Sequence, residues 1–168
     1  GGSGGGPKKD GVDVIETDGS NCMNMPVEAL ELEAPARVHR MSLRTDSGGV
    51  GEFRGGLGCV REIEFLTDNI ALTHRGERHR HAARGSQGGG DGAKAFSKIL
   101  RRDGSEEVVN SKLLTVVHAG ERLIVETAGG GGYGKPNKRD RQAVRDDVNN
   151  RKVSQQRADN EYGLGDAD

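Results

Sequence analysis

The chain has 168 residues, enough for one domain, but 28 are glycine and only 3% are aromatic. With 32% hydrophobic residues and a mean hydropathy of -0.73, we expect a thin core and a domain that depends on a partner. The 25 Lys and Arg residues balance 26 Asp and Glu residues, which argues against nucleic acid or a membrane as that partner. Cys22 and Cys59 form no C-x-x-C pair, which favours a reduced, cytoplasmic protein.

The first predicted region is a glycine-rich N-terminal segment with a short helix, residues 1–36. Residues 1–11 carry no hydrophobic periodicity and are typical of a linker. A short strand is expected at residues 12–15 and a turn at Asp18–Gly19. Pro26 suits the first position of a helix, which Pro35 would close.

The second predicted region, residues 37–134, is a β-rich body. Apolar and polar residues alternate in segments 36–48, 58–68, 69–80, 93–109 and 113–132, which is the period of a strand. Asp103–Gly104 and Ala119–Gly120 predict hairpin turns between these strands. Short strands at hairpin spacing favour an antiparallel sandwich or barrel.

The third predicted region, residues 135–168, is a polar helical tail. Asp140 and Ser154 can each cap a helix, and Gly163 can end the second one. We expect this tail to dock weakly on the β body or on a neighbouring chain. The predicted fold is therefore mainly β, with an antiparallel sandwich or barrel-like body and a short C-terminal helical tail.

The glycine run at residues 128–136, "AGGGGYGKP", is close to a phosphate-binding P-loop. That motif requires Ser or Thr after the lysine to ligate Mg²⁺, and here Pro136 follows Lys135. Proline also pushes Lys135 away from the helical conformation that a P-loop needs at this position. We therefore interpret the run as an exit from a strand where another backbone can approach closely.

Two other segments are candidates for binding. In "HRGERHRHAAR", His79 and His81 would share one face of a strand and could share a metal ion, but the neighbouring arginines would repel a cation. We therefore expect no metal, and interpret the segment as a charged solvated or interfacial strand whose arginines could bind an anion. Arg54 stands among glycines, so we expect its guanidinium to be unshielded and to face a substrate cavity or a subunit seam.

Four segments, taken together, resemble the C-terminal portion of the hydantoinase B/oxoprolinase family. They are "NMPVEALELEAPARVHRMSLRTDSGGVGEFRGGLGCVREIEF", "GERHRHAARGSQGGGDGA", "ETAGGGGYGKP" and the tail "RDRQAVRDDVNNRKVSQQRADNEYG". Each glycine motif is weak alone, but four in the same order make the resemblance specific.

The resemblance implies the C-terminal part, or a split subunit, of a heteromeric ATP-dependent cyclic-amide hydrolase of the hydantoinase or 5-oxoprolinase type. The alternatives are a subunit of a related acetone or acetophenone carboxylase, or a non-catalytic assembly subunit. The implied partners are a hydantoinase A-type subunit that binds ATP, the N-terminal part of the B-type subunit, and a small-molecule substrate.

In this family the metal ligands lie in the N-terminal part of the B-type subunit. We therefore expect this chain to bind no cofactor and to be inactive alone, with ATP and a divalent metal in the complete enzyme. No residue is assigned a catalytic role. The candidate substrate or interface residues are Arg54, Gly55, Gly56, Arg78, Arg80, Gly130, Gly131 and Tyr133.

Overall fold

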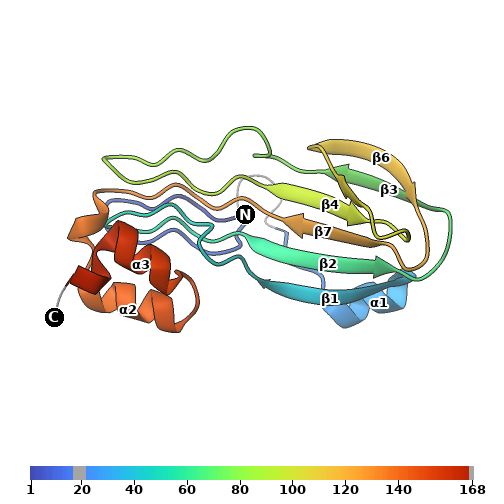
Figure 1. Ribbon diagram of the computed structural model, residues 1–168, viewed down its shortest axis with the longest axis horizontal. Coiled ribbons are helices and arrows are strands. Elements are labelled where there is room, and N and C mark those ends of the chain that lie inside the picture. Colours follow the sequence, from blue (N-terminus) through green and yellow to red (C-terminus); the bar gives the residue numbers. More distant parts are fainter. Residues whose placement is uncertain (17–21, 167–168) are drawn as a thin grey trace.

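Three parts follow one another along the molecule: the strands with the first helix at one end, glycine-rich segments in the middle and the C-terminal helices at the other end (Figure 1). The structure is a computed structural model that describes residues 1–16 and 22–166. The turn predicted at Asp18–Gly19 lies outside the described residues. In the described part of the chain, no helix is both long and apolar enough to cross a bilayer.

The strands form two antiparallel sheets. The larger sheet has the order β1 (Ala36–Leu43), β2 (Cys59–Phe65), β7 (Arg122–Glu126), β4 (Phe96–Leu100) and β5 (Glu106–Val108). The smaller sheet pairs β3 (Ile70–Arg75) with β6 (Lys112–Val117). This arrangement confirms the predicted mainly β, antiparallel architecture.

A hydrophobic core lies between the two sheets. Its buried residues come from β2, β4, β6, β7 and the loop after β5: Phe65, Ile99, Val117, Leu123 and Val109. Each such side chain contributes about 1.5–3 kcal/mol when it is fully buried. The opposite face of the large sheet instead carries ion pairs, such as His39–Glu64 at 2.6 Å and Arg122–Glu62 at 3.0 Å. The polar pairs on this second face leave the apolar packing mainly to the face that meets the small sheet, so the core is thin.

Of the two predicted hairpin turns, one is confirmed and one is wrong. The Asp103–Gly104 turn joins β4 to its antiparallel partner β5. Residues Ala119–Gly120 do form a turn, and Gly120 has a φ of +82°. However, this turn leads from β6 in the small sheet to β7 in the large sheet. A turn signal reports only a local reversal of the chain, whereas distant strands decide the pairing.

The strand predicted at residues 12–15 is also absent. The segment makes single backbone bonds to different parts of the chain: Val14 N donates to Leu57 O at 2.9 Å, and Ile15 N donates to Gly1 O at 2.8 Å. Val14 has a φ of +45°, which interrupts an extended strand.

The helices begin and end close to the predicted signals. α1 (Val27–Glu33) follows Pro26, which is the N-cap rather than the first helical residue. In the tail, a short 3-10 turn (Pro136–Lys138) precedes α2 (Arg141–Asn149) and α3 (Gln155–Tyr162), and a second (Leu164–Asp166) follows them. The side chains of Asp140 and Ser154 accept the capping hydrogen bonds of α2 and α3. Gly163 ends α3 in the left-handed conformation.

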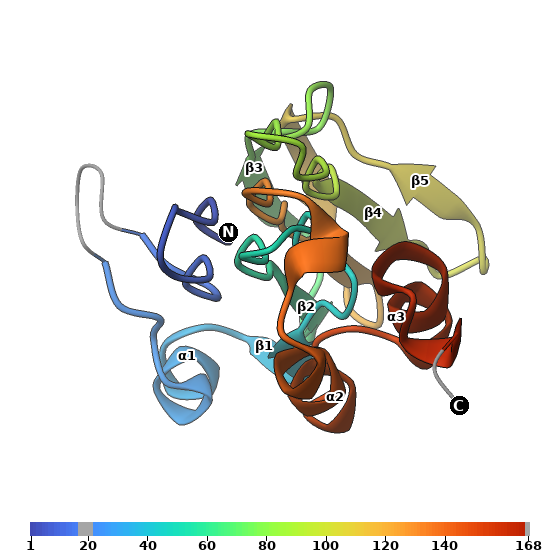
Figure 2. The same cartoon turned by 90° about the vertical axis from the view of Figure 1, so that its left-hand side faces the viewer.

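Four glycine-rich segments, residues 1–5, 47–58, 83–93 and 128–134, run side by side and form the middle of the molecule, which we call the glycine bundle (Figures 1 and 2). Backbone hydrogen bonds link one segment to another. For example, Gly2 N donates to Ala128 O at 3.1 Å, and Gly5 N donates to Gly131 O at 2.8 Å. Donors and acceptors both recur after three residues, which is the period of a polyproline II helix.

The segment 128–134 shows why glycine is required in this bundle. A Cβ added at any of Gly129 to Gly132 would lie within 2.2 Å of a backbone oxygen of another segment. The facing oxygens belong, in order, to Ser47, Ser3, Arg84 and Val50. Gly129 and Gly132, three residues apart, thus face the same segment. Only glycine lets neighbouring backbones approach this closely.

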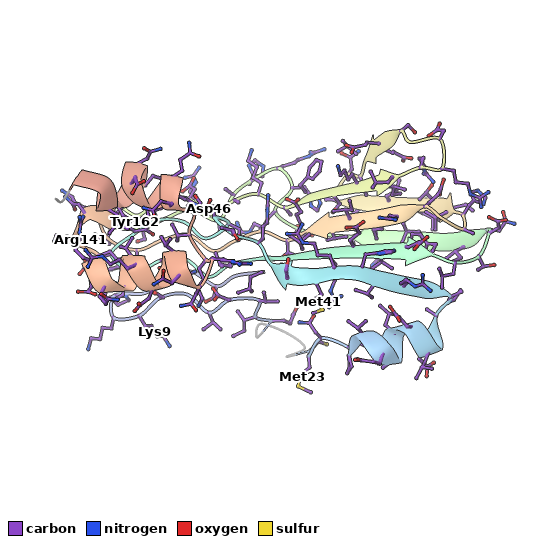
Figure 3. The ribbon with its side chains drawn as sticks, turned by 60° about the horizontal axis from the view of Figure 1, so that its bottom comes forward. Lys9, Met23, Met41, Asp46, Arg141 and Tyr162 are labelled. Carbon is purple, nitrogen blue, oxygen red and sulfur yellow. The ribbon has the colours of Figure 1, made fainter. Side chains whose placement is uncertain are left out.

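The helical tail packs on one end of the bundle. Val50 from the bundle forms a buried cluster with Val144, Val153, Ala158 and Tyr162 from the tail. Asp46 Oδ1 also accepts a hydrogen bond from Ser154 N at 2.8 Å, and Figure 3 shows Asp46 beside the helices that carry Arg141 and Tyr162. The prediction of weak docking is therefore wrong, because the contact includes a buried core of its own.

Candidate functional site

Arg54 is buried rather than unshielded, with 2% of its surface exposed. Its Nη1 donates to Gly55 O at 2.6 Å and to Asp13 Oδ1 at 3.2 Å, and its Nε lies 3.4 Å from Asp147 Oδ2. The expectation of an unshielded guanidinium is therefore wrong. The glycines beside Arg54 have no side chains, and the space around the guanidinium is filled by the carboxylates of Asp13 from the N-terminal segment and Asp147 from α2.

A second buried arginine extends this ion-pair network. Arg139 binds both carboxylate oxygens of Asp10, at 2.7 and 2.6 Å, and Asp147 Oδ2 at 2.8 Å. Burial alone would raise the pKa of Asp10, but the hydrogen bond and charge of Arg139 outweigh it, so the pKa is lowered. The pKa of Arg139 is raised, because its carboxylate partners outweigh the effect of burial. The network locks the tail and the N-terminal segment onto the glycine bundle.

The candidate glycines lie inside the bundle. A Cβ on Gly55 would lie 2.0 Å from Gly130 O, and one on Gly56 would lie 2.1 Å from Val12 O. The backbone that approaches Gly55, Gly56, Gly130 and Gly131 is therefore that of this chain.

Backbone of the same chain also contacts the P-loop-like run, residues 128–136. The amides of Gly129, Gly130, Gly132, Tyr133 and Gly134 all donate to carbonyl oxygens of other segments. A P-loop instead directs its amides at phosphate. The groups that approach this glycine run are therefore backbone carbonyls of the same chain.

Tyr133 lies at the helical end of the bundle. It is half-buried, and its ring centroid lies 6.5 Å from that of Phe53. The two residues also exchange backbone hydrogen bonds of 3.0 and 2.9 Å. This pairing holds two bundle segments together.

Arg78 and Arg80 lie apart from the other candidates, in the exposed segment after β3. The strand ends at Arg75, and Arg78 has a φ of +65°, so the predicted charged strand at this point is wrong. Both arginines line an open cavity of about 510 Å³ together with Glu77, His79, His81 and Ser111. The cavity offers cationic and imidazole groups to an anionic or polar ligand.

Two further cavities adjoin each other where the sheets meet the glycine bundle, and both are lined by Gly1, Glu16, Val125 and Thr127. The first, about 390 Å³, lies on the apolar face of β2 and β7 and is lined there by Cys59, Arg61, Ile63 and Leu123. We call it the apolar cavity. The second, about 380 Å³, is lined by the segment His74–His79, Ala95 and Glu126. We call it the histidine cavity.

Polar groups of the apolar cavity are held by neighbours from distant parts of the chain. Arg61 Nη2 donates to Asn24 Oδ1 at 2.5 Å, which ties β2 to the N-terminal segment. Thr127 Oγ1 accepts a hydrogen bond from Cys59 N at 2.7 Å. The result is an apolar floor with a guanidinium at its edge, an arrangement that can hold a small ring by its carbonyl oxygen.

An apolar surface borders the same cavity. Met23 is 93% exposed, and Met25, Met41 and Leu43 are also exposed. Figure 3 shows Met23 and Met41 on the side of the molecule beside β1. Apolar surface of this kind is typical of a protein–protein contact.

His74, Arg61 and Asn24 were missed as site residues from the sequence. For His74 a signal existed: Ile70, Leu72 and His74 alternate along β3, and the first two pack against the core. For Arg61 and Asn24 no local signal existed, because they meet across 37 residues. Within residues 1–16 and 22–166, no three or more His, Cys, Asp or Glu residues gather as a set of metal ligands.

The chain is therefore a β module of two antiparallel sheets that continues into the glycine bundle, and the helical tail packs on the far end of the bundle. The chain belongs to the hydantoinase B/oxoprolinase family, whose model matches residues 1–136.

The chain is 33% identical over 158 residues to the B-type chain of a putative D-/L-hydantoinase from Pseudomonas sp. strain NS671, a match that covers 93% of this chain but 26% of that relative. The crystal structure of ATP-dependent caprolactamase from Pseudomonas jessenii superposes with a TM-score of 0.78 at 34% identity, over 99% of this chain and 30% of that one. A nucleotide-free acetone carboxylase superposes with a TM-score of 0.79 at 19% identity, over 94% of this chain and 25% of that one, which shows a shared fold alone. The chain thus spans about a quarter of the hydantoinase relative's length.

Proposed function

We propose that the chain is the C-terminal part, or a split subunit, of a heteromeric ATP-dependent hydrolase that opens cyclic amides. Its partners in this proposal are an A-type ATP-binding subunit and the N-terminal part of the B-type subunit. The family match over residues 1–136 and the similarity to a B-type hydantoinase chain and to ATP-dependent caprolactamase support it.

The observation that carries the proposal is the glycine bundle. Glycine motifs that are scattered in the sequence come together in one hydrogen-bonded bundle beside the two cavities. The chain's role is then to form a fixed wall of the active site and an interface for its partners. The apolar surface around Met41 and Leu43 supports the second part of this role.

The described residues offer neither a P-loop for ATP nor a set of three side-chain ligands for a divalent catalytic metal. Five amides of the 128–134 run already donate to carbonyls, and no set of three metal ligands occurs in residues 1–16 and 22–166. We therefore assign both groups to the partner chains. Two free cysteines, one exposed and one buried, are compatible with a cytoplasmic enzyme.

A substrate panel tests the proposed reaction. Hydantoin, 5-oxoproline and caprolactam are each incubated with ATP and either the isolated chain or the complete complex. We expect ring opening only with the complete complex, and turnover by the isolated chain would refute the division of roles. A parallel incubation of acetone with labelled bicarbonate tests the carboxylase alternative, and incorporation of label without ring opening would replace the proposal.

A further inference from the structure

Two histidines face each other at the wall of the histidine cavity. His74 at the end of β3 is 7% exposed, and His79 follows in the next segment. Their ring centroids are 5.7 Å apart and their planes meet at 82°. Both residues line the cavity of about 380 Å³.

The facing nitrogens have no hydrogen-bond partner. His74 Nε2 and His79 Nδ1 are both buried, and neither is hydrogen-bonded. A Cβ added to Gly76 would lie 3.2 Å from the first nitrogen, 3.4 Å from the second and 2.5 Å from His79 Cε1, so both rings approach Gly76 closely. Buried polar atoms in native proteins nearly always have a partner, and leaving one without a partner costs about 1–3 kcal/mol. Two such atoms, on imidazole rings whose centroids lie 5.7 Å apart, are a candidate pair of ligands for one bound group.

We propose that His74 and His79 form a two-histidine binding site for a divalent transition-metal ion such as Zn²⁺. Imidazole is a preferred ligand of zinc, and two imidazoles on one zinc ion have ring centroids about 5–6 Å apart. The remaining coordination positions face the histidine cavity, which has room for water. The inference does not rest on the proposed function of the complex.

The outer contact of His79 fits this role. Its Nε2 lies 3.3 Å from the hydroxyl of Ser97, which is fully buried in β4. A metal-bound histidine generally makes such a contact through its second ring nitrogen, which fixes the tautomer and the ring orientation. The hydroxyl can accept a hydrogen bond from Nε2–H, and in that tautomer the lone pair of Nδ1 is free for the ion.

The charges around the pair do not exclude a cation. Arg75 and Arg78 line the histidine cavity, but so do Glu16, Glu77 and Glu126. A continuous strand would place His79 beside His81, whereas the structure places His79 beside His74. Burial, and secondarily the neighbouring His79, lower the pKa of His74, which favours the neutral imidazole that ligation requires.

The test is a titration of the 168-residue chain with Zn²⁺ alone, followed by calorimetry and by NMR of ¹⁵N-labelled imidazoles. The chain has 5 histidines, few enough to assign. We expect one ion per chain and shifts of His74 Nε2 and His79 Nδ1. His79→Gln should weaken binding by at least about tenfold, since even outer-shell changes have that effect. Its fold is checked by circular dichroism and by the melting temperature without metal.

The matched control is His81→Gln, because His81 lies on the same segment and is exposed. Unchanged Zn²⁺ affinity in this variant supports the site. If Zn²⁺ shifts only the exposed histidines His39 and His81, or if His79→Gln binds as wild type does, the site is refuted. If His74→Gln fails to fold, His79→Gln and the NMR shifts still decide the question.

Discussion

Replacement of Gly130 by alanine should destabilise the whole glycine bundle. The new Cβ would stand 1.9 Å from Ser3 O, whereas an ordinary contact needs roughly 3.5 Å. The N-terminal segment must therefore move by more than about 1 Å, and the hydrogen bond of 2.8 Å that Ser3 O accepts from Gly56 N is lost. Overpacking costs about 1–3 kcal/mol and the hydrogen bond about 1 kcal/mol more. We expect a loss of about 3 kcal/mol, which lowers the melting temperature by about 6–12 °C.

Urea denaturation and calorimetry of the purified chain measure this effect, and Gly4→Ala is the matched control. Gly4 belongs to the same bundle, but a Cβ there would meet only Gly131 O at an ordinary 3.7 Å. Its backbone is not left-handed, so alanine should be neutral or stabilising by about 0.4–1 kcal/mol. Equal stability of the two variants would refute the argument that close backbone approach selects glycine in this bundle.

Three further predictions concern the buried charges and Tyr162. Arg139→Ala removes the partner of the buried Asp147 and of the half-buried Asp10, and should cost about 3–5 kcal/mol in urea denaturation. Lys98→Ala, which breaks an exposed pair, should cost less than about 1 kcal/mol, and equal losses would contradict the network's role. Because the pKa of Asp10 is lowered in the folded chain, its ionised carboxylate stabilises the fold at pH above about 3.9, the pKa in the unfolded chain. This stabilisation is lost as the pH falls through the pKa of Asp10 in the folded chain. Asp10→Asn should therefore lose less stability on acidification than wild type, and parallel acid curves would contradict this. Burial raises the pKa of Tyr162 to about 12. The neutral phenol therefore stabilises the fold fully below pH about 10, the pKa in the unfolded chain, and this stabilisation, up to about 3 kcal/mol, is lost as the pH rises through the folded pKa. Tyr162→Phe should not show that loss in alkaline melts, and an unchanged profile would refute the assignment.

The strands and helix caps could be predicted because their signals are local. Alternation of apolar and polar residues gave the antiparallel β body, and Asp103–Gly104 gave one hairpin. The capping side chains of Asp140 and Ser154 gave the starts of α2 and α3. Each of these elements forms from neighbours within a few residues, which a pattern in the sequence can report.

The glycine bundle and the partners of Arg54 could not be predicted. The close backbone approach expected at residues 128–136 is confirmed. Glycine-rich segments have no hydrophobic period, however, so the sequence does not show which segments approach one another or that residues 1–5 join them. Arg54 is enclosed by Asp13, 41 residues away, and by Asp147 from α2. Such contacts depend on how the whole chain folds. The contact between His74 and His79 also depends on the whole fold, because the chain leaves the strand after Arg75 and turns His79 back toward His74.

The most direct test of the proposed function compares ATP-dependent ring opening by the complex with and without this chain. The A-type subunit and the upstream B-type part are assayed alone and after the chain is added back, with phosphate release and the opened ring measured together. The account predicts that ring opening coupled to ATP hydrolysis appears only after addition of the chain. Full coupled turnover without the chain would contradict the claim that it belongs to the catalytic complex.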